Sequence, residues 1–479
     1  MLSFFKRLSP WILLAGLVYL LILDFGEIDG RLLSGGSDSS QNLHSALNLL
    51  HHGTYSEASL GENVLPGYRR EPAPNFLLGL YLGFVANLFS GFNYLDFPAD
   101  STLIMMSKWI NLGYAAALLL SVWFLIRLLV RPTLFADGLS LLLFALINHF
   151  FIIEQLNTLN TELSAALCFI WLSLALVLSD QSSRLTWVGV SGLCFGLLIL
   201  TKASGAYIGL LAIPVFVFYI AQKFRKFFKV FALFSLGFVC AVLPWIARNY
   251  YEFDRPVVAQ GAGDILLIRS AFNTMNAREF SRAFYAYAPR TIREDLLGPA
   301  MELSDEDFAC GQNLDRFNRK LDCDKKALKE QRYDDVRSFY QIGKRALPLS
   351  LGLEREQKQP EAIIRILASP MQHVLVSLPM AWRGLWSFGN KISVVAIVLN
   401  VLSYLALFVA PIVGVVQKRP VWIYLSLMPV GYFLFYAAFS HFLPRYSEPL
   451  IPLAMICFLL MTTDCLAKLF PRSNVRLTF

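Results

Sequence analysis

Charged side chains stand near the ends of several long apolar runs in this sequence, and their types suit two kinds of chemistry. Asp38 and Glu162 carry carboxylates, and a carboxylate can remove a hydroxyl proton while that oxygen attacks another atom. Lys202, Arg248 and Arg445 carry cations, which stabilise negative charge that develops on phosphate oxygens. An arginine fork can hold two phosphate oxygens, whereas lysine acts as a point charge. The fold must bring such groups together for them to act as one site.

The composition requires a fold with a very large apolar surface. Of 479 residues, 56% are hydrophobic and only 16% are charged, against about 25% charged in an ordinary globular protein. The mean hydropathy is +0.53. One soluble core cannot bury so many apolar side chains, so a soluble enzyme, a disordered protein and a fibrous protein are excluded. The sequence indicates an all-α membrane protein with many spans.

The long apolar runs are the elements that must position the charged side chains. Most of them approach the ~20 residues that cross ~30 Å of hydrocarbon, and in lipid they should be helices because no water satisfies open backbone groups. No small-residue cleavage site follows the first run, so we expect it to remain as a span. The runs lie near residues 10–23, 74–92, 107–127, 132–151, 162–179, 186–201, 205–221, 228–247, 392–416, 421–439 and 449–466.

The net charge of +8 comes largely from short basic clusters between these runs. This is the positive-inside pattern of membrane proteins, which we prefer to an explanation by nucleic acid contact. Residues 24–73 and 248–372 then lie outside. The clusters that should face the cytoplasm are Lys6/Arg7, Arg127/Arg131, residues 223–229, Lys418/Arg419 and the tail with Lys468, Arg472 and Arg476.

The orientation of these clusters limits the number of spans. If residues 74–92 crossed fully, the cluster at 223–229 would lie outside. We therefore expect ten full spans, with 74–92 half-inserted or lying along the outer interface. The alternatives are a short run between 186 and 221 that does not span, and a total of up to twelve spans. Residues 373–388 have the pattern of a second interfacial helix.

The first outer loop, residues 24–73, contains one amphipathic segment. Residues 39–52 place Leu43, Ala46 and Leu47 at helical spacing, and Gly53 is a good helix stop. We expect a helix that lies on the outer membrane surface with its apolar side toward the lipid.

The large outer loop, residues 248–372, holds 20 Lys+Arg and 19 Asp+Glu, which predicts a small, partly helical extracytoplasmic domain, most helix-rich over 304–340. Cys310 and Cys323 both fall in it, whereas the other five cysteines fall in apolar runs. An oxidising compartment would favour a disulfide between these two. The alternative is two free thiols in a cytoplasmic loop; a metal pair is disfavoured because no His lies near them.

Six motifs follow one another along the chain: Asp38-Ser-Ser-Gln to Gly53-Thr-Tyr55, Arg69-Arg-Glu-Pro72, Leu159-Asn-Thr-Glu162, Leu200-Thr-Lys202, Pro244-Trp-Ile-Ala-Arg248-Asn249-Tyr250 and Pro444-Arg445-Tyr446-Ser-Glu-Pro449. In this order they resemble the GT-C superfamily of integral membrane glycosyltransferases. The nearest branches would be the protein O-mannosyltransferases and the lipid A aminoarabinose transferases. Three departures stand out: Ser39 where many relatives have a second acid, Asn42 where many have an aromatic residue, and Pro72-Ala-Pro74 for the usual Pro-Pro.

The resemblance implies a GT-C-like helical bundle that transfers a hexosyl or pentosyl group from a polyprenyl-phosphate carrier, with inversion. The acceptor would be an envelope glycolipid such as lipopolysaccharide, a glycan or a protein, and the membrane would be a bacterial inner membrane with the site facing the periplasm. The expected organisation is a transmembrane module over 1–247, a loop domain over 248–372, and an interfacial helix with C-terminal spans over 373–479. Neither a cofactor nor a catalytic metal is expected, and no nucleic acid partner.

The resemblance also implies roles for the acids. Asp38 is the candidate general base, and Glu162 a second acid that orients the acceptor or assists the base. Asp38 could instead cap a helix together with Gln41, and Glu162 could simply be stabilised by a helix N-terminus. Reserve acids are Glu71, which could pair with a neighbouring arginine, and Glu154.

The candidate cations for the donor phosphate are Arg248, Lys202, Arg445, Arg69 and Arg70, at outer ends of spans or in the first outer loop. They could instead snorkel to lipid headgroups. The positive-inside bias makes bases on the outer face less expected, which favours a specific role.

Two other functions are open at this point: a transporter or flippase for polyprenyl-linked glycans, and an O-antigen polymerase or ligase. The sequence shows no inverted halves with matched interrupted helices, and charges avoid the middles of most spans. Both features favour the glycosyltransferase over the transporter.

Overall fold

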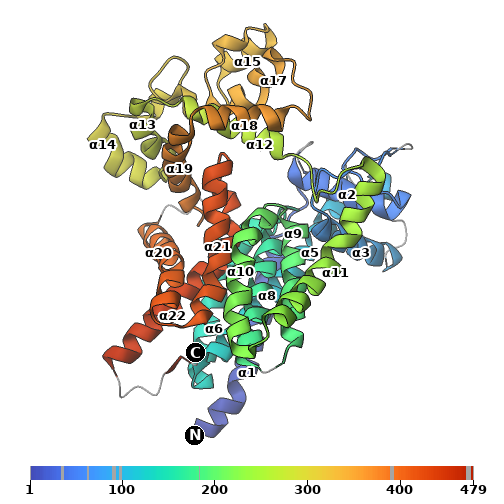
Figure 1. Cartoon of the computed structure of the whole chain (residues 1–479), viewed down its shortest axis with the longest axis vertical. Helices are drawn as coiled ribbons and strands as arrows, with labels where there is room; N and C mark the ends of the chain where they lie inside the picture. Colours follow the sequence, from blue (N-terminus) through green and yellow to red (C-terminus); the bar gives the residue numbers. More distant parts are fainter. Residues whose placement is uncertain are drawn as a thin grey trace. The chain divides into compact units, whose positions relative to one another are not determined.

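The computed structural model is drawn in Figure 1. It describes residues 2–33, 37–61, 64–88, 93–96, 100–182, 184–388, 393–470 and 476–477. Arg472 and the side chains of Lys6, Arg7 and Arg476 lie outside the described part. The described residues are almost entirely helical, as expected, apart from an antiparallel pairing of β1 (Val130–Arg131) with β2 (Arg476–Leu477).

Within the described residues, nine helical segments are long and apolar enough to cross a membrane. The bent pair α18 (Lys358–Ala368) and α19 (Pro370–Leu385), with 102° between its halves, would make a tenth. Helix α9 (Thr186–Thr201) has 16 residues and is the short run named above as the alternative to ten spans. The nine segments are Leu8–Glu27 in α1 (Leu2–Glu27), α4–α5 (Ser101–Lys108, Ile110–Leu129), α6–η2–α7 (Thr133–Ile147, Asn148–Ile152, Ile153–Gln155), α8 (Glu162–Gln181), α10 (Gly205–Phe224), α11 (Phe227–Phe253), α20 (Val394–Val416), α21 (Pro420–Phe439) and η9–η10–α22 (Pro444–Tyr446, Glu448–Leu450, Ile451–Leu469).

The chain forms two compact units. Unit 1 comprises residues 1–260, 402–431 and 448–479, and unit 2 comprises residues 261–401 and 432–447. Helix α11 continues to Phe253, because apolar and aromatic residues carry it past residue 247, and α19 packs with unit 2.

Helix α9 packs against both α8 and α11 in unit 1. Glycines let α9 and α11 approach closely: a Cβ on Gly192 would lie 1.9 Å from the Phe234 carbonyl oxygen, and one on Gly237 would lie 2.0 Å from the Gly189 carbonyl oxygen. Small residues serve this purpose in membrane helix pairs, where burial from water supplies no driving force. The contact fixes the ends of both helices relative to α8.

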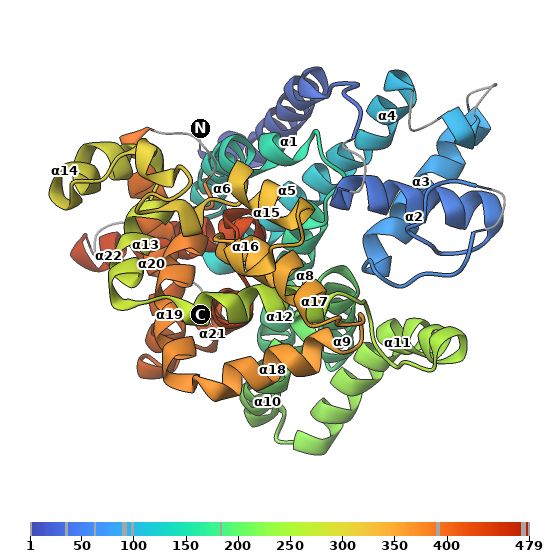
Figure 2. The same cartoon turned by 90° about the horizontal axis from the view of Figure 1, so that it is seen from above.

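Helix α2 (Asp38–His52) forms where the spacing predicts it and ends at Gly53, whose φ of 64° lies in the left-handed region. Its apolar side does not face lipid as expected. Leu43 and Leu47 are buried against Leu78 and Leu82 of α3 (Pro72–Leu88), because the apolar residues of the 74–92 run form the partner surface. Figure 2 shows α2 and α3 side by side. Helix α3 is not among the segments of span length.

Two ion pairs lie at opposite ends of the unit 1 helices. The start of α8 and the end of α9 meet, since Glu162 and Lys202 form an ion pair. Arg127 of α5 lies at the other end of the bundle, where it pairs with the buried Asp137 of α6, which also accepts from Ser9. This separation is what the basic clusters predict; the side of the membrane on which each end lies stays a prediction.

Unit 2 is a set of short helices around α12 (Ala262–Ala271), α13 (Ala277–Tyr287), α18 and α19. The prediction that 304–340 is its most helix-rich part is wrong, because that stretch is mostly single turns fixed by local capping and ion pairs.

The remaining elements of the described chain are η1 (Tyr94–Asp96), η3 (Phe272–Thr274), η4 (Ile292–Leu297), α14 (Gly298–Met301), η5 (Asp305–Phe308), η6 (Asp315–Phe317), α15 (Asp322–Lys329), η7 (Tyr333–Asp335), α16 (Phe339–Gln341), η8 (Ile342–Ala346) and α17 (Leu347–Ser350).

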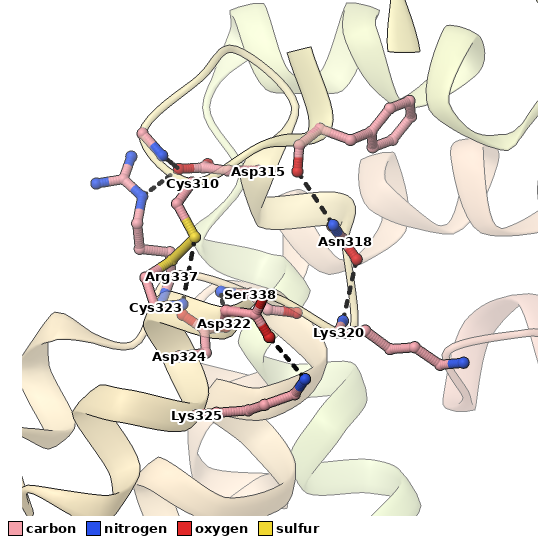
Figure 3. The surroundings of a disulfide bond; sticks show 12 residues. Cys310, Asp315, Asn318, Lys320, Asp322, Cys323, Asp324, Lys325, Arg337 and Ser338 are labelled. Carbon is pink, nitrogen blue, oxygen red and sulfur yellow. Dashed lines mark hydrogen bonds and ion pairs between the residues drawn. A yellow bond between two sulfur atoms is a disulfide. The ribbon is translucent and has the colours of Figure 1, made fainter. Parts of the chain in front are cut away.

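A disulfide joins Cys310 to Cys323 in unit 2, with the two sulfurs 2.11 Å apart (Figure 3). Two carboxylates near the disulfide, those of Asp315 and Asp324, bind the extended segment at Arg337. The buried Asp315 pairs with the Arg337 guanidinium, and Asp324 accepts from the Arg337 backbone N–H at 2.8 Å. The disulfide thus cross-links an irregular, partly exposed stretch of unit 2.

Candidate functional site

Asp38 is the first residue of α2 and forms an ion pair with Arg70. The Arg70 Nε also donates to the Gln41 side chain at 2.9 Å, so one guanidinium bridges two residues on the first turn of α2. The N-cap is Ser37, which accepts from the Ser40 N–H at 3.2 Å. The alternative that Asp38 caps this helix is therefore wrong, because the preceding serine does so and leaves the carboxylate to Arg70.

The residue after Asp38 ties α2 to the loop before α8. The Ser39 hydroxyl donates to the Asn160 side chain at 2.9 Å and accepts from the Leu159 N–H at 3.1 Å. Asn42 donates to the Leu159 carbonyl at 2.7 Å. Since Glu162 begins α8 two residues after Asn160, these bonds bring the turn that carries Asp38 to the end of α8 that carries Glu162.

Glu162 and Lys202 form a buried ion pair with Nζ 3.3 Å from Oε1. Their side chains are 5% and 10% exposed. The second carboxylate oxygen, Oε2, is buried and has no hydrogen-bond partner among the described residues. A buried carboxylate oxygen without a donor is costly, so it marks a place where a donor from outside the chain would be accepted.

A set of amide side chains fixes the loop between α7 and α8. Asn111 donates to the carbonyls of Gln155, Leu156 and Thr158 at 3.2, 3.0 and 2.7 Å. Asn157 donates to the Glu27 carbonyl at 2.8 Å, which joins the loop to the end of α1. The loop that positions Glu162 is therefore held from several helices.

Arg248 lies against the backbone of the first outer loop. Its Nη1 donates to the Gly67 carbonyl at 2.7 Å, its Nη2 donates to the Tyr55 carbonyl at 3.3 Å, and the Trp245 ring lies 4.8 Å from its guanidinium carbon. Much of its hydrogen-bonding capacity is thus used within the chain. The structure places Arg248 as an anchor of the loop that carries Arg70.

Tyr55 links this anchor to α3. Its hydroxyl lies 3.1 Å from the carbonyl oxygens of Arg70 and Glu71 and accepts from Asn75 at 2.8 Å. Burial raises the pKa of Tyr55, so the phenol stays protonated and can donate to these carbonyls. The backbone at Arg70 is fixed in this way beside Asp38.

The other expected residues lie differently. Arg69 and Glu154 are exposed, and neither makes an ion pair in the described part of the chain. Glu71 contributes its backbone carbonyl, while its carboxylate pairs with neither neighbouring arginine in the described structure. Arg445 belongs to unit 2. Unit 1 therefore brings Asp38, Arg70, Glu162, Lys202 and Arg248 into one connected network.

Sequence reasoning missed the neutral members of this network. Asn75 and Asn111 help to hold the charged residues in place, and neither was singled out. Gln41 was named only as a possible capping partner of Asp38, whereas it accepts from Arg70. The departure at Asn42 carried a signal: a polar side chain on the apolar side of an amphipathic helix needs a hydrogen-bond partner, and here that partner is the Leu159 carbonyl.

Comparisons with known proteins give structural matches alone. No family model matches the sequence, and no curated protein matches it significantly. The chain is similar to the archaeal oligosaccharyltransferase AglB from Archaeoglobus fulgidus, solved with an inhibitory peptide and a dolichol-phosphate, at 13% identity and a TM-score of 0.49, covering 98% of this chain and 53% of AglB. It is also similar to ArnT from Cupriavidus metallidurans bound to undecaprenyl phosphate, at 12% identity and a TM-score of 0.40, covering 97% of this chain and 81% of ArnT.

A third match is the Archaeoglobus fulgidus oligosaccharyltransferase in complex with Zn and sulfate, at 13% identity and a TM-score of 0.45, covering 95% of this chain and 50% of that protein. The chain spans about half the length of the two oligosaccharyltransferases.

Proposed function

We propose that the chain is a glycosyltransferase that moves a sugar from a polyprenyl-phosphate carrier to a hydroxyl group of an extracytoplasmic acceptor, with inversion. The observation that supports this proposal is the meeting of two carboxylate–cation pairs, Asp38–Arg70 and Glu162–Lys202, at one end of the unit 1 bundle. The ordered motifs that resemble the GT-C superfamily contribute all four residues.

Asp38 takes the role of general base in this mechanism. Its side chain is 38% exposed, so an acceptor arriving from water can reach the carboxylate. Arg70 donates to the Gln41 side chain, and its backbone carbonyl accepts from the Tyr55 hydroxyl. Held in this way, Arg70 fixes the direction in which the Asp38 carboxylate points. An oriented base within reach of the acceptor hydroxyl is what inversion by direct attack requires.

Glu162 and Lys202 are too buried to serve as the base and supply the second part of the mechanism. Glu162 Oε2 accepts a hydrogen bond from the acceptor or the donor sugar, and Lys202 partly balances its charge. The donor phosphate is held by Arg70 and Arg69 of the first outer loop, which Arg248 anchors through the Gly67 and Tyr55 carbonyls. The sugar then lies between the phosphate and Asp38.

The test is a transfer assay with the full-length protein in detergent and polyprenyl-phosphate sugars of several kinds. Asp38→Asn keeps the shape of the side chain but cannot accept the proton, and we expect transfer to fall by about 10²–10⁴-fold while donor binding stays within twofold. Asp180→Asn is the matched control, because Asp180 lies on α8 at the end opposite to Glu162. Full transfer by Asp38→Asn would exclude Asp38 as the base.

Sealed vesicles distinguish the transporter. With labelled polyprenyl-linked glycan added outside, a glycosyltransferase produces labelled acceptor without moving the carrier across the bilayer. Protein-dependent protection of the carrier, with no transfer to any acceptor, would reject the enzyme in favour of a flippase.

A further inference from the structure

Three basic side chains of unit 2 gather without an acid. Arg319, Lys344 and Arg383 make no ion pair in the part of the chain that the structure describes. Nearby bases of the same unit are matched, as Arg316 is with Glu279 and Lys358 with Asp264. The three unmatched cations are therefore a local feature of this unit.

The first two cations share one aromatic ring. The Arg319 guanidinium carbon lies 3.7 Å from the Tyr340 ring centroid, and Lys344 Nζ lies 5.2 Å from it and donates to the Tyr340 hydroxyl at 3.0 Å. The two charges therefore lie within about 9 Å of each other, inside the ~10 Å over which 0.1 M salt screens charges. They repel each other unless an anion lies between or beside them.

His441 connects this ring to the third cation. Its ring lies 5.3 Å from the Tyr340 ring, and its carbonyl accepts from Arg383 Nη1 at 3.0 Å. The residue is 4% exposed, and its Nδ1 is buried with no hydrogen-bond partner in the described structure. Burial and the nearby Arg383, Arg319, Arg445 and Lys344 hold the pKa of His441 well below its usual value.

The charges that act most strongly on His441 are thus all basic, and its ring stays neutral. A neutral imidazole can carry its proton on Nδ1 and donate it to an anion. The cluster offers one unused ring nitrogen, two arginine forks and a lysine ammonium from four segments of unit 2: η6–α15, η8, α19 and the turn after α21. Figure 2 labels α15 and α19, which belong to these segments.

We propose that Arg319, Lys344, Arg383 and His441 form a binding site for a phosphate monoester group. A phosphate monoester carries a charge of about −1.5 to −2 near pH 7 and three strong acceptor oxygens, which matches several cationic donors. A carboxylate carries one charge and would leave two of these cations unbalanced. Arginine forks hold phosphate oxygens in pairs, and the aromatic rings keep the guanidinium planes in place.

All residues of this site belong to unit 2, and its test measures binding alone, so its failure leaves the proposal for Asp38 untouched. The phosphate group can be part of a lipid or of a soluble molecule, and the two sources share the chemistry that the site recognises. The experiment therefore uses one probe of each kind.

The full-length protein in a neutral detergent is titrated calorimetrically with inorganic phosphate and with dihexanoyl phosphatidic acid, a water-soluble lipid phosphate monoester. Arg319→Gln combined with Lys344→Gln removes two charge-assisted contacts, and we expect binding to weaken by at least about tenfold. Lys325→Gln combined with Lys329→Gln removes the same charge from α15 and should change binding by less than about twofold. Lys344→Gln alone is an exposed substitution that keeps the test valid if the double variant does not fold.

Saturable binding of either probe that depends on Arg319 and Lys344 supports the site. Binding of both with mutual competition assigns recognition to the phosphate group itself, whereas binding of phosphatidic acid alone or of inorganic phosphate alone assigns the lipid or the soluble source. The proposal is overturned if wild-type protein binds neither probe, if Lys344→Gln and the double variant bind as tightly as wild type, or if the Lys325/Lys329 control weakens binding equally.

Discussion

At the scale of single residues, Asp38 and Glu162 are both paired with a base but differ in access to solvent. Asp38 is 38% exposed, and Glu162 is 5% exposed with one oxygen lacking a donor in the described structure. Their environments therefore suit different work. The exposed acid can exchange a proton with an arriving hydroxyl, and the buried one can only accept a hydrogen bond from a group that reaches the same interior position.

Arg70 should be a positioning residue whose geometry matters beyond its charge. Arg70→Lys keeps the charge, but one ammonium cannot bridge Asp38 and Gln41 as the guanidinium does. We expect kcat to fall about tenfold or more, because a misdirected base slows the chemical step, and KM for the donor to change less, because lysine keeps a positive charge for the phosphate. Initial rates over a range of donor concentrations measure this. An unchanged kcat would show that the direction of Asp38 does not depend on Arg70.

His441 gives a pH prediction with a definite sign. The folded pKa of His441 lies well below the usual value, because of burial and the surrounding bases. As pH falls from about 7.5 to about 5.5, the unfolded chain takes up a proton that the folded chain does not, so stability decreases by at most about 1.4 kcal/mol per pH unit from this group. The melting temperature of His441→Gln in detergent should therefore fall less over this range than that of wild type. Equal falls would contradict the assignment.

At the scale of elements, the contact between α9 and α11 sets the geometry of the site. Lys202 follows α9 and Arg248 lies near the end of α11, so the two are positioned by the crossing at Gly192 and Gly237. A substitution at this crossing should therefore displace Lys202 and Arg248, although the crossing lies several helical turns away from both residues.

Gly237→Ala tests the crossing, because the added methyl group would lie 2.0 Å from a backbone oxygen of α9. Backbone cannot move aside as a flexible side chain can, so we expect a loss of about 1–3 kcal/mol and reduced transfer. Gly138→Ala on α6 is the control, since nothing lies within 4 Å of its added methyl group, and it should leave stability unchanged or raise it. Thermal unfolding followed by circular dichroism compares them; equal behaviour of the two variants would refute a close crossing.

The sequence predicts apolar helices and the amphipathic α2 well, because both depend on local periodicity. It does not predict that α3 covers the apolar side of α2, or that Arg70 pairs with Asp38, since these depend on contacts between distant segments. The stretch 304–340 fails for the same reason: Asp315 and Asp324 hold Arg337 in an irregular segment, and propensity does not report such pairing.

At the scale of the whole molecule, the chain divides into two compact units that are stabilised differently. Both units contain ion pairs, but the disulfide Cys310–Cys323 belongs to unit 2, and the cysteines described in unit 1 are free. Loss of the disulfide should therefore act mainly on unit 2.

Replacing both Cys310 and Cys323 by serine should destabilise unit 2 by up to about 3 kcal/mol, the entropy that a loop of this size loses in the unfolded chain. Limited proteolysis should then cut faster between residues 304 and 340, while cleavage in unit 1 stays as in wild type. Mass spectrometry of the fragments locates the cuts. Uniformly faster cleavage of both units would show that they do not unfold separately.

The loop before α8 is held by asparagine side chains, and an amide keeps the same charge in weak acid and in weak base. A change in pH therefore leaves the hydrogen bonds that hold this loop intact. The loop should stay equally protected from hydrogen exchange on mild acidification, whatever the effect of acid on transfer.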